Sequence, residues 1–145
     1  MLRKSVRQAA TAPRTKKALQ ELRVFAREAM KHARMDDYER GLVLLCVDEV
    51  LTAIVENAER FGNTEAELHL VIDIDDVRVR IMIEDSETRF DNRFDEERFT
   101  TIREDEGRRE IDIVFLNSVM DEITYNYQKG LHNVLIMTKF LPGAD

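Results

Sequence analysis

The sequence predicts an α+β protein, a two-layer α/β sandwich in which helices cover one face of an antiparallel-rich sheet. In the first half of the chain, apolar residues recur at steps of three and four, which is typical of amphipathic helices; from residue 67 the period changes to two, which is typical of strands with one buried face. The expected order is helix, helix, hairpin, long loop, helix, hairpin. This order favours helices and strands in separate layers.

Length and composition indicate a single domain over residues 1–145. The chain is 43% hydrophobic and 35% charged, as expected for a folded domain with a polar surface. Its net charge of −7 disfavours direct binding to nucleic acid or to an anionic membrane. We find no apolar run long enough to span a bilayer and no signal peptide, so we expect a cytoplasmic protein.

The only cysteine, Cys46, excludes an intrachain disulfide and fits a reducing compartment. It lies in an apolar helical stretch, so we expect a buried and inert thiol; a reactive thiol is the alternative. The three histidines have no ligand spacing with one another or with Cys46, and the sequence therefore predicts no metal cluster.

The first half of the chain is expected to hold two helices. The N-terminal segment, residues 1–13, offers only a short edge strand around residues 6–11. One apolar face over residues 14–30 predicts the first helix. The second helix is capped by Asp36 at its start and by Gly62, in a left-handed conformation, at its end. Its apolar stripe consists of Val43, Val47, Val50, Ile54, Ala58 and Phe61.

A β-hairpin follows the second helix. Residues 68–74 and 77–83 alternate between apolar and polar side chains, which predicts two strands with one buried face. Asp85 continues the buried parity of the second strand, so its carboxylate would point toward the covered face and need a partner. The alternative is that the strand has ended and Asp85 begins a turn.

The last third of the chain combines a long loop with a helix and a second hairpin. Residues 86–110 are dense in charge and contain one glycine, which predicts a lid-like loop. Helical spacing returns over residues 111–121. Two strands follow at residues 123–127 and 134–140, with a turn at Lys129-Gly130.

Three stretches resemble the anti-sigma-factor branch of the GHKL ATPase superfamily, whose members include small serine protein kinases that hold sigma factors. DEVLTAIVENAERFG (residues 48–62) is similar to the N-box helix of that family. IEDSETRF (83–90) stands where the family has an Asp-x-Gly-x-Gly-Phe turn, and VMDEITYNYQKGLHNVLIMTKF (119–140) resembles its closing helix end and hairpin. The resemblance covers roughly residues 15–141 and implies a Bergerat-type, histidine kinase-like ATPase fold.

The resemblance also implies roles for four residues. Glu49 matches the general base that acts on water or on a substrate serine hydroxyl. Asp85 matches the aspartate that hydrogen-bonds the adenine amino group. Ala53 replaces the asparagine that holds Mg²⁺, and a methyl group cannot coordinate a metal ion. Asn57, one turn further, would serve the nucleotide only if the phosphates lay about 6 Å further along the helix.

The glycines of the family's phosphate-binding turns are mostly replaced. Glu87 and Arg89 stand at the two glycines that follow the adenine-binding aspartate. The next glycine-rich turn, whose backbone amides bind phosphate in the family, is matched only by Gly107 and Arg108, about one turn early. These two residues are the remaining nucleotide-binding candidates.

Three functions agree with these features. The first is an anti-sigma-factor-like regulator that binds a sigma factor, an anti-sigma-factor antagonist or both in a partner-switching system, with weak or lost ATP hydrolysis. The second is an active ATP-dependent serine/threonine kinase of the antagonist, in which Asn57 or Gly107 restores the site. The third is a structural or dimerisation domain. The resemblance implies ATP or ADP as the cofactor, Mg²⁺ without its usual ligand, and a possible homodimer.

Overall fold

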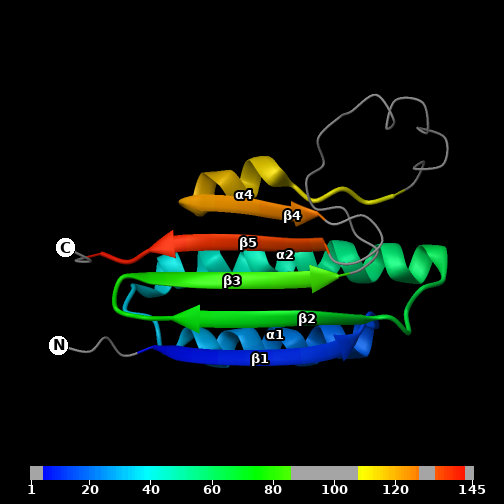
Figure 1. Cartoon of the computed structure of the whole chain (residues 1–145), viewed down its shortest axis with the longest axis horizontal. Helices are drawn as coiled ribbons and strands as arrows, with labels where there is room; N and C mark the ends of the chain where they lie inside the picture. Colours follow the sequence, from blue (N-terminus) through cyan, green and yellow to red (C-terminus); the bar gives the residue numbers. More distant parts are fainter. Residues whose placement is uncertain (1–4, 86–107, 128–132, 143–145) are drawn as a thin grey trace.

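The computed structural model describes residues 5–85, 108–127 and 133–142. Within them the chain forms one antiparallel sheet, with helices packed on one of its faces (Figure 1). This arrangement confirms the predicted two-layer α+β fold. The elements are β1 (Val6–Pro13), α1 (Lys16–Met30), α2 (Asp37–Phe61), β2 (Glu67–Ile74), β3 (Arg78–Asp85), α4 (Ile113–Val119), β4 (Glu122–Tyr127) and β5 (Asn133–Phe140).

The sheet has five strands in the order β1-β2-β3-β5-β4, and every neighbouring pair is antiparallel. β1 is longer than the predicted strand and runs to Pro13, while α4 is shorter than the predicted residues 111–121. Asp112 caps α4 by accepting a hydrogen bond from the Phe115 N–H, and Met120 is already extended. Of the predicted loop, residues 86–107 lie outside the described residues, as does the turn at Lys129-Gly130.

Side-chain caps set the ends of the two long helices. Thr15, rather than Arg14, precedes the first helical residue, and its hydroxyl accepts a hydrogen bond from the Ala18 N–H at 3.1 Å. α2 begins behind Asp36, as predicted. It ends at Gly62, whose φ of 82° lies in the left-handed region that glycine adopts without strain.

The core lies between the sheet and the helices. Cross-strand partners such as Ile81 and Met137 share the inner face and are fully buried. Cys46 on α2 is fully buried too, as predicted. Phe61 departs from the predicted apolar stripe, because it is 44% exposed at the end of α2.

Asp85 is the last residue of β3 and its side chain is fully buried. It pairs with Leu68 of β2 and so points toward the helices. The inward orientation predicted from parity is confirmed, and the alternative of a turn beginning at Asp85 is wrong.

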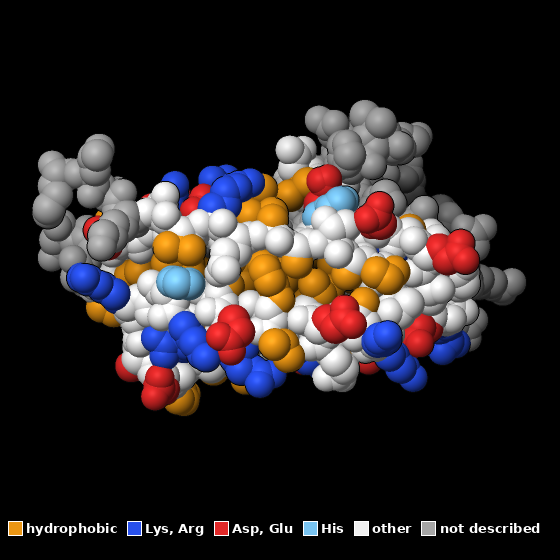
Figure 2. Space-filling view, turned by 90° about the horizontal axis from the view of Figure 1, so that it is seen from below, with side chains coloured by type: hydrophobic (Ala, Val, Ile, Leu, Met, Phe, Trp, Pro, Cys, Tyr) orange, Lys and Arg blue, Asp and Glu red, His pale blue; other side chains and the backbone are white. Residues whose placement is uncertain are grey.

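The two edges of the sheet differ. At one edge, α4 lies beside β4, whereas β1 forms the other edge (Figure 1). Viewed from the β1 side, hydrophobic side chains gather in a band along the middle of the molecule (Figure 2). Val6, Ala10 and Phe25 are partly exposed on β1 and α1. No helix in the described part of the chain is both long and apolar enough to cross a membrane.

Candidate functional site

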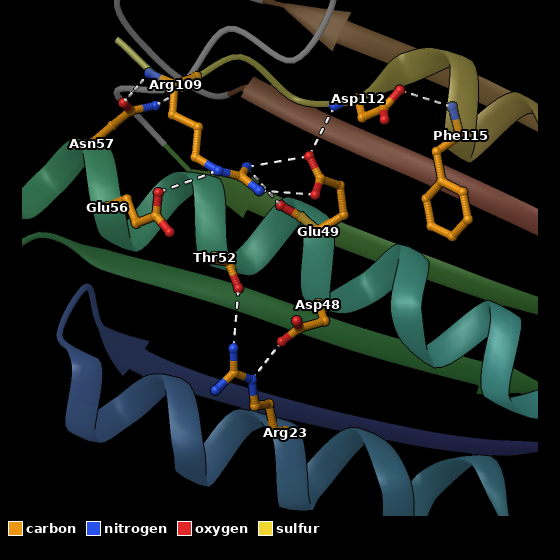
Figure 3. Close-up of polar contacts among 9 residues, drawn as sticks. All are labelled: Arg23, Asp48, Glu49, Thr52, Glu56, Asn57, Arg109, Asp112 and Phe115. Atoms are coloured by element: carbon orange, nitrogen blue, oxygen red, sulfur yellow. Dashed lines mark hydrogen bonds and ion pairs between the residues drawn. The ribbon is translucent and has the colours of Figure 1, made fainter. Parts of the chain in front are cut away.

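The candidate site lies along one face of α2, which carries Glu49, Ala53 and Asn57 on successive turns. Ala53 is fully buried, Asn57 is nearly so, and the Glu49 side chain is 18% exposed. Glu49 and Asn57 face the segment that leads into α4 (Figure 3). The helix therefore presents one carboxylate and one amide to the same segment, with the buried Ala53 one turn from each.

Both carboxylate oxygens of Glu49 are bound by the segment before α4 (Figure 3). Arg109 donates from Nη2 to Oε1 at 2.9 Å and from Nη1 to Oε2 at 3.2 Å, a two-pronged guanidinium–carboxylate contact. The Asp112 backbone N–H donates to Oε2 at 2.9 Å. Glu49 is thus held by a cation and by the backbone next to the start of α4.

Arg109 makes further contacts with α2. The Asn57 amide forms two hydrogen bonds with the Arg109 backbone, donating to its C=O and accepting from its N–H, each at 2.8 Å. Nε of Arg109 lies 3.2 Å from a carboxylate oxygen of Glu56. Sequence reasoning missed Arg109, since the residue lies in the predicted loop; the consecutive arginines in GRRE, beside an acidic helix face, were the one available signal.

The described residues at this position do not fit a magnesium ion. Mg²⁺ requires oxygen ligands in near-octahedral geometry at about 2.0–2.1 Å. Ala53 supplies no oxygen, and the oxygens of Glu49 already accept hydrogen bonds from Arg109 and Asp112. Among the described residues, no group of three or more His, Cys, Asp or Glu side chains is placed to hold a metal ion.

Asp85 lies in the core, where it forms an ion pair with Arg14. Arg14 Nη2 is 2.6 Å from Asp85 Oδ1, and the two side chains are 2% and 0% exposed. Arg14 joins β1 to α1, so the pair connects that junction to the end of β3. An adenine amino group that hydrogen-bonded Asp85 would meet a carboxylate already held by a guanidinium.

The other predicted nucleotide residues are not all described. Arg108 stacks its guanidinium over the Phe61 ring, 4.5 Å from the ring centroid, and so lies at the end of α2. Gly107 lies outside the described residues. The nucleotide-binding roles of Asp85, Asn57, Gly107 and Arg108 stay predictions.

Cys46 lies one turn before Glu49 on α2. Burial raises the pKa of its thiol from 9.0 to about 12, and the negative charge of Glu49 adds to the shift, while Lys139 opposes it. The neutral thiol therefore persists through the physiological pH range. This agrees with the predicted inert cysteine.

A separate groove of about 190 Å³ lies between α1 and α2. Its rim carries Arg23, Arg27 and Asp48, and Arg23 hydrogen-bonds both Asp48 and Thr52 (Figure 3). The described residues that line it include neither Glu49 nor Asp85. The groove is therefore distinct from the candidate site.

Comparison with known proteins agrees with this architecture. A family model described as the histidine kinase-like ATPase domain matches residues 12–139. A chain in the crystal structure of the SiaB–SiaC complex from Pseudomonas aeruginosa is similar, with a TM-score of 0.60 and 12% sequence identity over 92% of this chain and 89% of that chain. At this identity, the similarity shows the fold alone. Curated protein sequences gave no match. Because the family model covers most of its length, the chain belongs to the histidine kinase-like ATPase domain family.

Proposed function

We propose that this chain is a regulatory protein of the anti-sigma-factor type, which binds protein partners in a partner-switching system and hydrolyses ATP weakly or not at all. Its partners are a sigma factor, an anti-sigma-factor antagonist or both, and it acts in the cytoplasm as a homodimer without contacting nucleic acid or membrane directly. Membership of the ATPase domain family supports this proposal, as does the likeness of its fold to a chain solved within a complex of two proteins.

One observation supports the proposed loss of ATP hydrolysis. A general base must have a carboxylate oxygen within hydrogen-bond reach of the nucleophile. Both oxygens of Glu49 are taken up by Arg109 and by the backbone of Asp112. Ala53, one turn along, offers no ligand for the cation that would neutralise the phosphates. A carboxylate held in this way supports a binding role more than a catalytic one.

Nucleotide binding without hydrolysis is part of the proposal. ATP or ADP would be recognised through Asp85, which would exchange its contact with Arg14 for the adenine amino group. A second candidate function is the ATP-dependent serine/threonine protein kinase. Glu49 and Asp85 support it, because both stand where the resemblance places the general base and the adenine-binding carboxylate.

Calorimetric titration with ATP and ADP, with and without Mg²⁺, tests the proposal. We expect any heat of binding to be independent of Mg²⁺ and to disappear in Asp85→Asn, and we expect little or no release of phosphate from ATP. Asp73→Asn is the matched control, because Asp73 lies on the outer face of the sheet. Micromolar binding that requires Mg²⁺, with phosphate transfer that Glu49→Gln abolishes, would establish the kinase instead.

A further inference from the structure

The face of α2 that runs from Glu49 to Asn57 holds one arginine through six polar contacts. Two come from the Glu49 carboxylate and one from the Glu56 carboxylate, all three to the guanidinium of Arg109. Arg109 Nη1 also donates to the backbone C=O of Glu49 at 3.3 Å. The other two contacts come from the Asn57 amide, which pairs with the backbone N–H and C=O of Arg109. The helix thus contacts both the side chain and the main chain of the same residue.

The geometry of these contacts selects a guanidinium. Glu49 meets both Nη atoms with its two oxygens, and Glu56 meets Nε on a different edge of the planar group. An ammonium group is compact and cannot span two oxygens in this parallel arrangement. The Arg109 side chain is 31% exposed, so the contact is only partly shielded from water.

The neighbouring residue, Arg108, also contacts α2. Arg108 lies over the ring of Phe61, one turn beyond Asn57, at a distance of 4.5 Å. Phe61 was expected in the apolar stripe but is 44% exposed, and its ring serves the arginine rather than the core. Two consecutive arginines are therefore bound along the C-terminal half of one helix.

We infer that this face of α2 is an arginine-binding site whose resident ligand is Arg109 of the same chain. A guanidinium then provides the positive charge beside Glu49, on the helix face where Ala53 stands at the position that the resemblance assigns to a magnesium ligand. The inference requires neither a nucleotide nor a partner protein, and so does not depend on the proposed function.

Chemical rescue of Arg109→Ala tests the inference. Ethylguanidinium should bind this variant roughly tenfold more tightly than ethylammonium, because only a planar fork reproduces the contact with Glu49. Binding is measured by the rise in melting temperature and by the shift of the Asn57 side-chain amide signals in nuclear magnetic resonance spectra. Adding Glu49→Gln should abolish the difference between the two compounds. Arg27→Ala, which removes an exposed arginine of α1, is the matched control and should not respond.

Equal binding of the two compounds, or an equal response of Arg27→Ala, would overturn the inference. If Arg109→Ala does not fold, a measurement on the wild-type protein tests the same inference. The Nη protons of Arg109 should give separate resonances at low temperature, because the fork hinders rotation of the guanidinium, and Glu49→Gln should merge them. A single averaged Arg109 resonance in the wild type, like that of exposed Arg27, would also overturn it. Neither readout involves nucleotide or a partner protein, so partner binding is tested separately. Failure here would remove the Glu49–Arg109 contact that supports the loss of ATP hydrolysis, and would leave the partner-binding part of the proposed function standing.

Discussion

At the residue scale, two acidic side chains each form an ion pair with an arginine of the same chain. Asp85 is paired with Arg14 in the core, and Glu49 with Arg109 near the surface. The two pairs differ in burial, and burial decides what each contributes. A fully buried pair costs desolvation energy, and losing one partner leaves a buried charge uncompensated.

We predict that the Arg14–Asp85 pair behaves as a coupled unit. Arg14→Met and Asp85→Leu should each lower the free energy of unfolding by about 3–5 kcal/mol, because each removes one member of a buried ion pair and leaves the charge of the other in the core. The double variant should recover most of that loss, since it removes both charges of the pair together. Urea denaturation measures all three.

The exposed pair of Arg7 and Asp73 is the control for that cycle. Its charged atoms are 3.6 Å apart and the Arg7 side chain is 60% exposed, so Arg7→Met should cost less than about 1 kcal/mol. If the double variant in the core loses the sum of the two single losses, the pair is not coupled.

The raised pKa of Cys46 predicts a loss of stability in alkali. The thiol of the unfolded chain ionises near 9, whereas burial keeps the folded-state pKa at about 12. Below pH 9 this thiol is neutral in both states and stability does not change. Between pH 9 and 12 the unfolded chain binds fewer protons, so the free energy of unfolding should fall by about 1.4 kcal/mol per pH unit.

Comparing the wild type with Cys46→Ala at pH 8 and pH 10 isolates that effect from the titration of other groups. The alkaline decrease should be smaller in the variant by about 1 kcal/mol. An identical decrease in both proteins would show that Cys46 does not cause it.

At the element scale, helix caps could be predicted because their signals are local. Asp36 and Gly62 were identified from residue type and spacing alone. Asp36 caps the start of α2 and Gly62 caps its end, as expected. The first turn of α1 was placed too early, because a helical pattern does not reveal that Arg14 is needed in the core. The end of α4 was predicted too late, because the apolar spacing continues past Val119 although the backbone is already extended at Met120.

Gly41 within α2 and Gly62, which caps its C-terminus, should respond oppositely to substitution by alanine. Gly62→Ala should destabilise the protein by about 1 kcal/mol, because a left-handed φ of 82° strains any residue with a Cβ. Gly41→Ala should stabilise it by about 0.5–1 kcal/mol, since an added Cβ meets nothing within 4 Å and alanine favours the helix. Thermal unfolding measures both. A loss of stability in Gly41→Ala would show that the helix geometry at this position is not ordinary.

At the scale of the whole molecule, the sheet leaves β1 as an open edge. In the described part of the chain β1 pairs only with β2, and the side that carries it shows an apolar band (Figure 2). An edge strand with small, uncharged side chains in its middle is ready to pair with another strand. We therefore place the contact of the proposed homodimer at β1.

Light scattering coupled to size-exclusion chromatography tests this placement. We expect the wild type to run as a dimer and Ala9→Lys as a monomer, because a lysine on an edge strand disfavours pairing. Thr124→Lys on β4 is the matched control and should stay dimeric. A monomeric wild type, or a dimer that survives Ala9→Lys, would refute the placement.

The whole molecule also shows why the candidate site was only partly predictable. Glu49, Ala53 and Asn57 were brought together by helical periodicity, which is a local property. Arg109, which binds Glu49 and Asn57, is 60 positions away from Glu49 in the chain, and no periodicity spans that distance. Likewise, parity predicted that Asp85 points inward, but only the tertiary structure identifies Arg14 as its partner.

Arg109 also competes with any other ligand that binds the Glu49 carboxylate. Because Arg109 is part of the same chain, it competes at an effective concentration on the order of millimolar or higher, which diluting the protein does not change. Arg109 therefore lowers the apparent affinity of Glu49 for a cation or nucleotide from solution by a factor that does not depend on protein concentration. Glu56→Gln would weaken the binding of Arg109 to α2. It would therefore raise the apparent affinity of Glu49 for an added ligand without altering any contact between that ligand and Glu49.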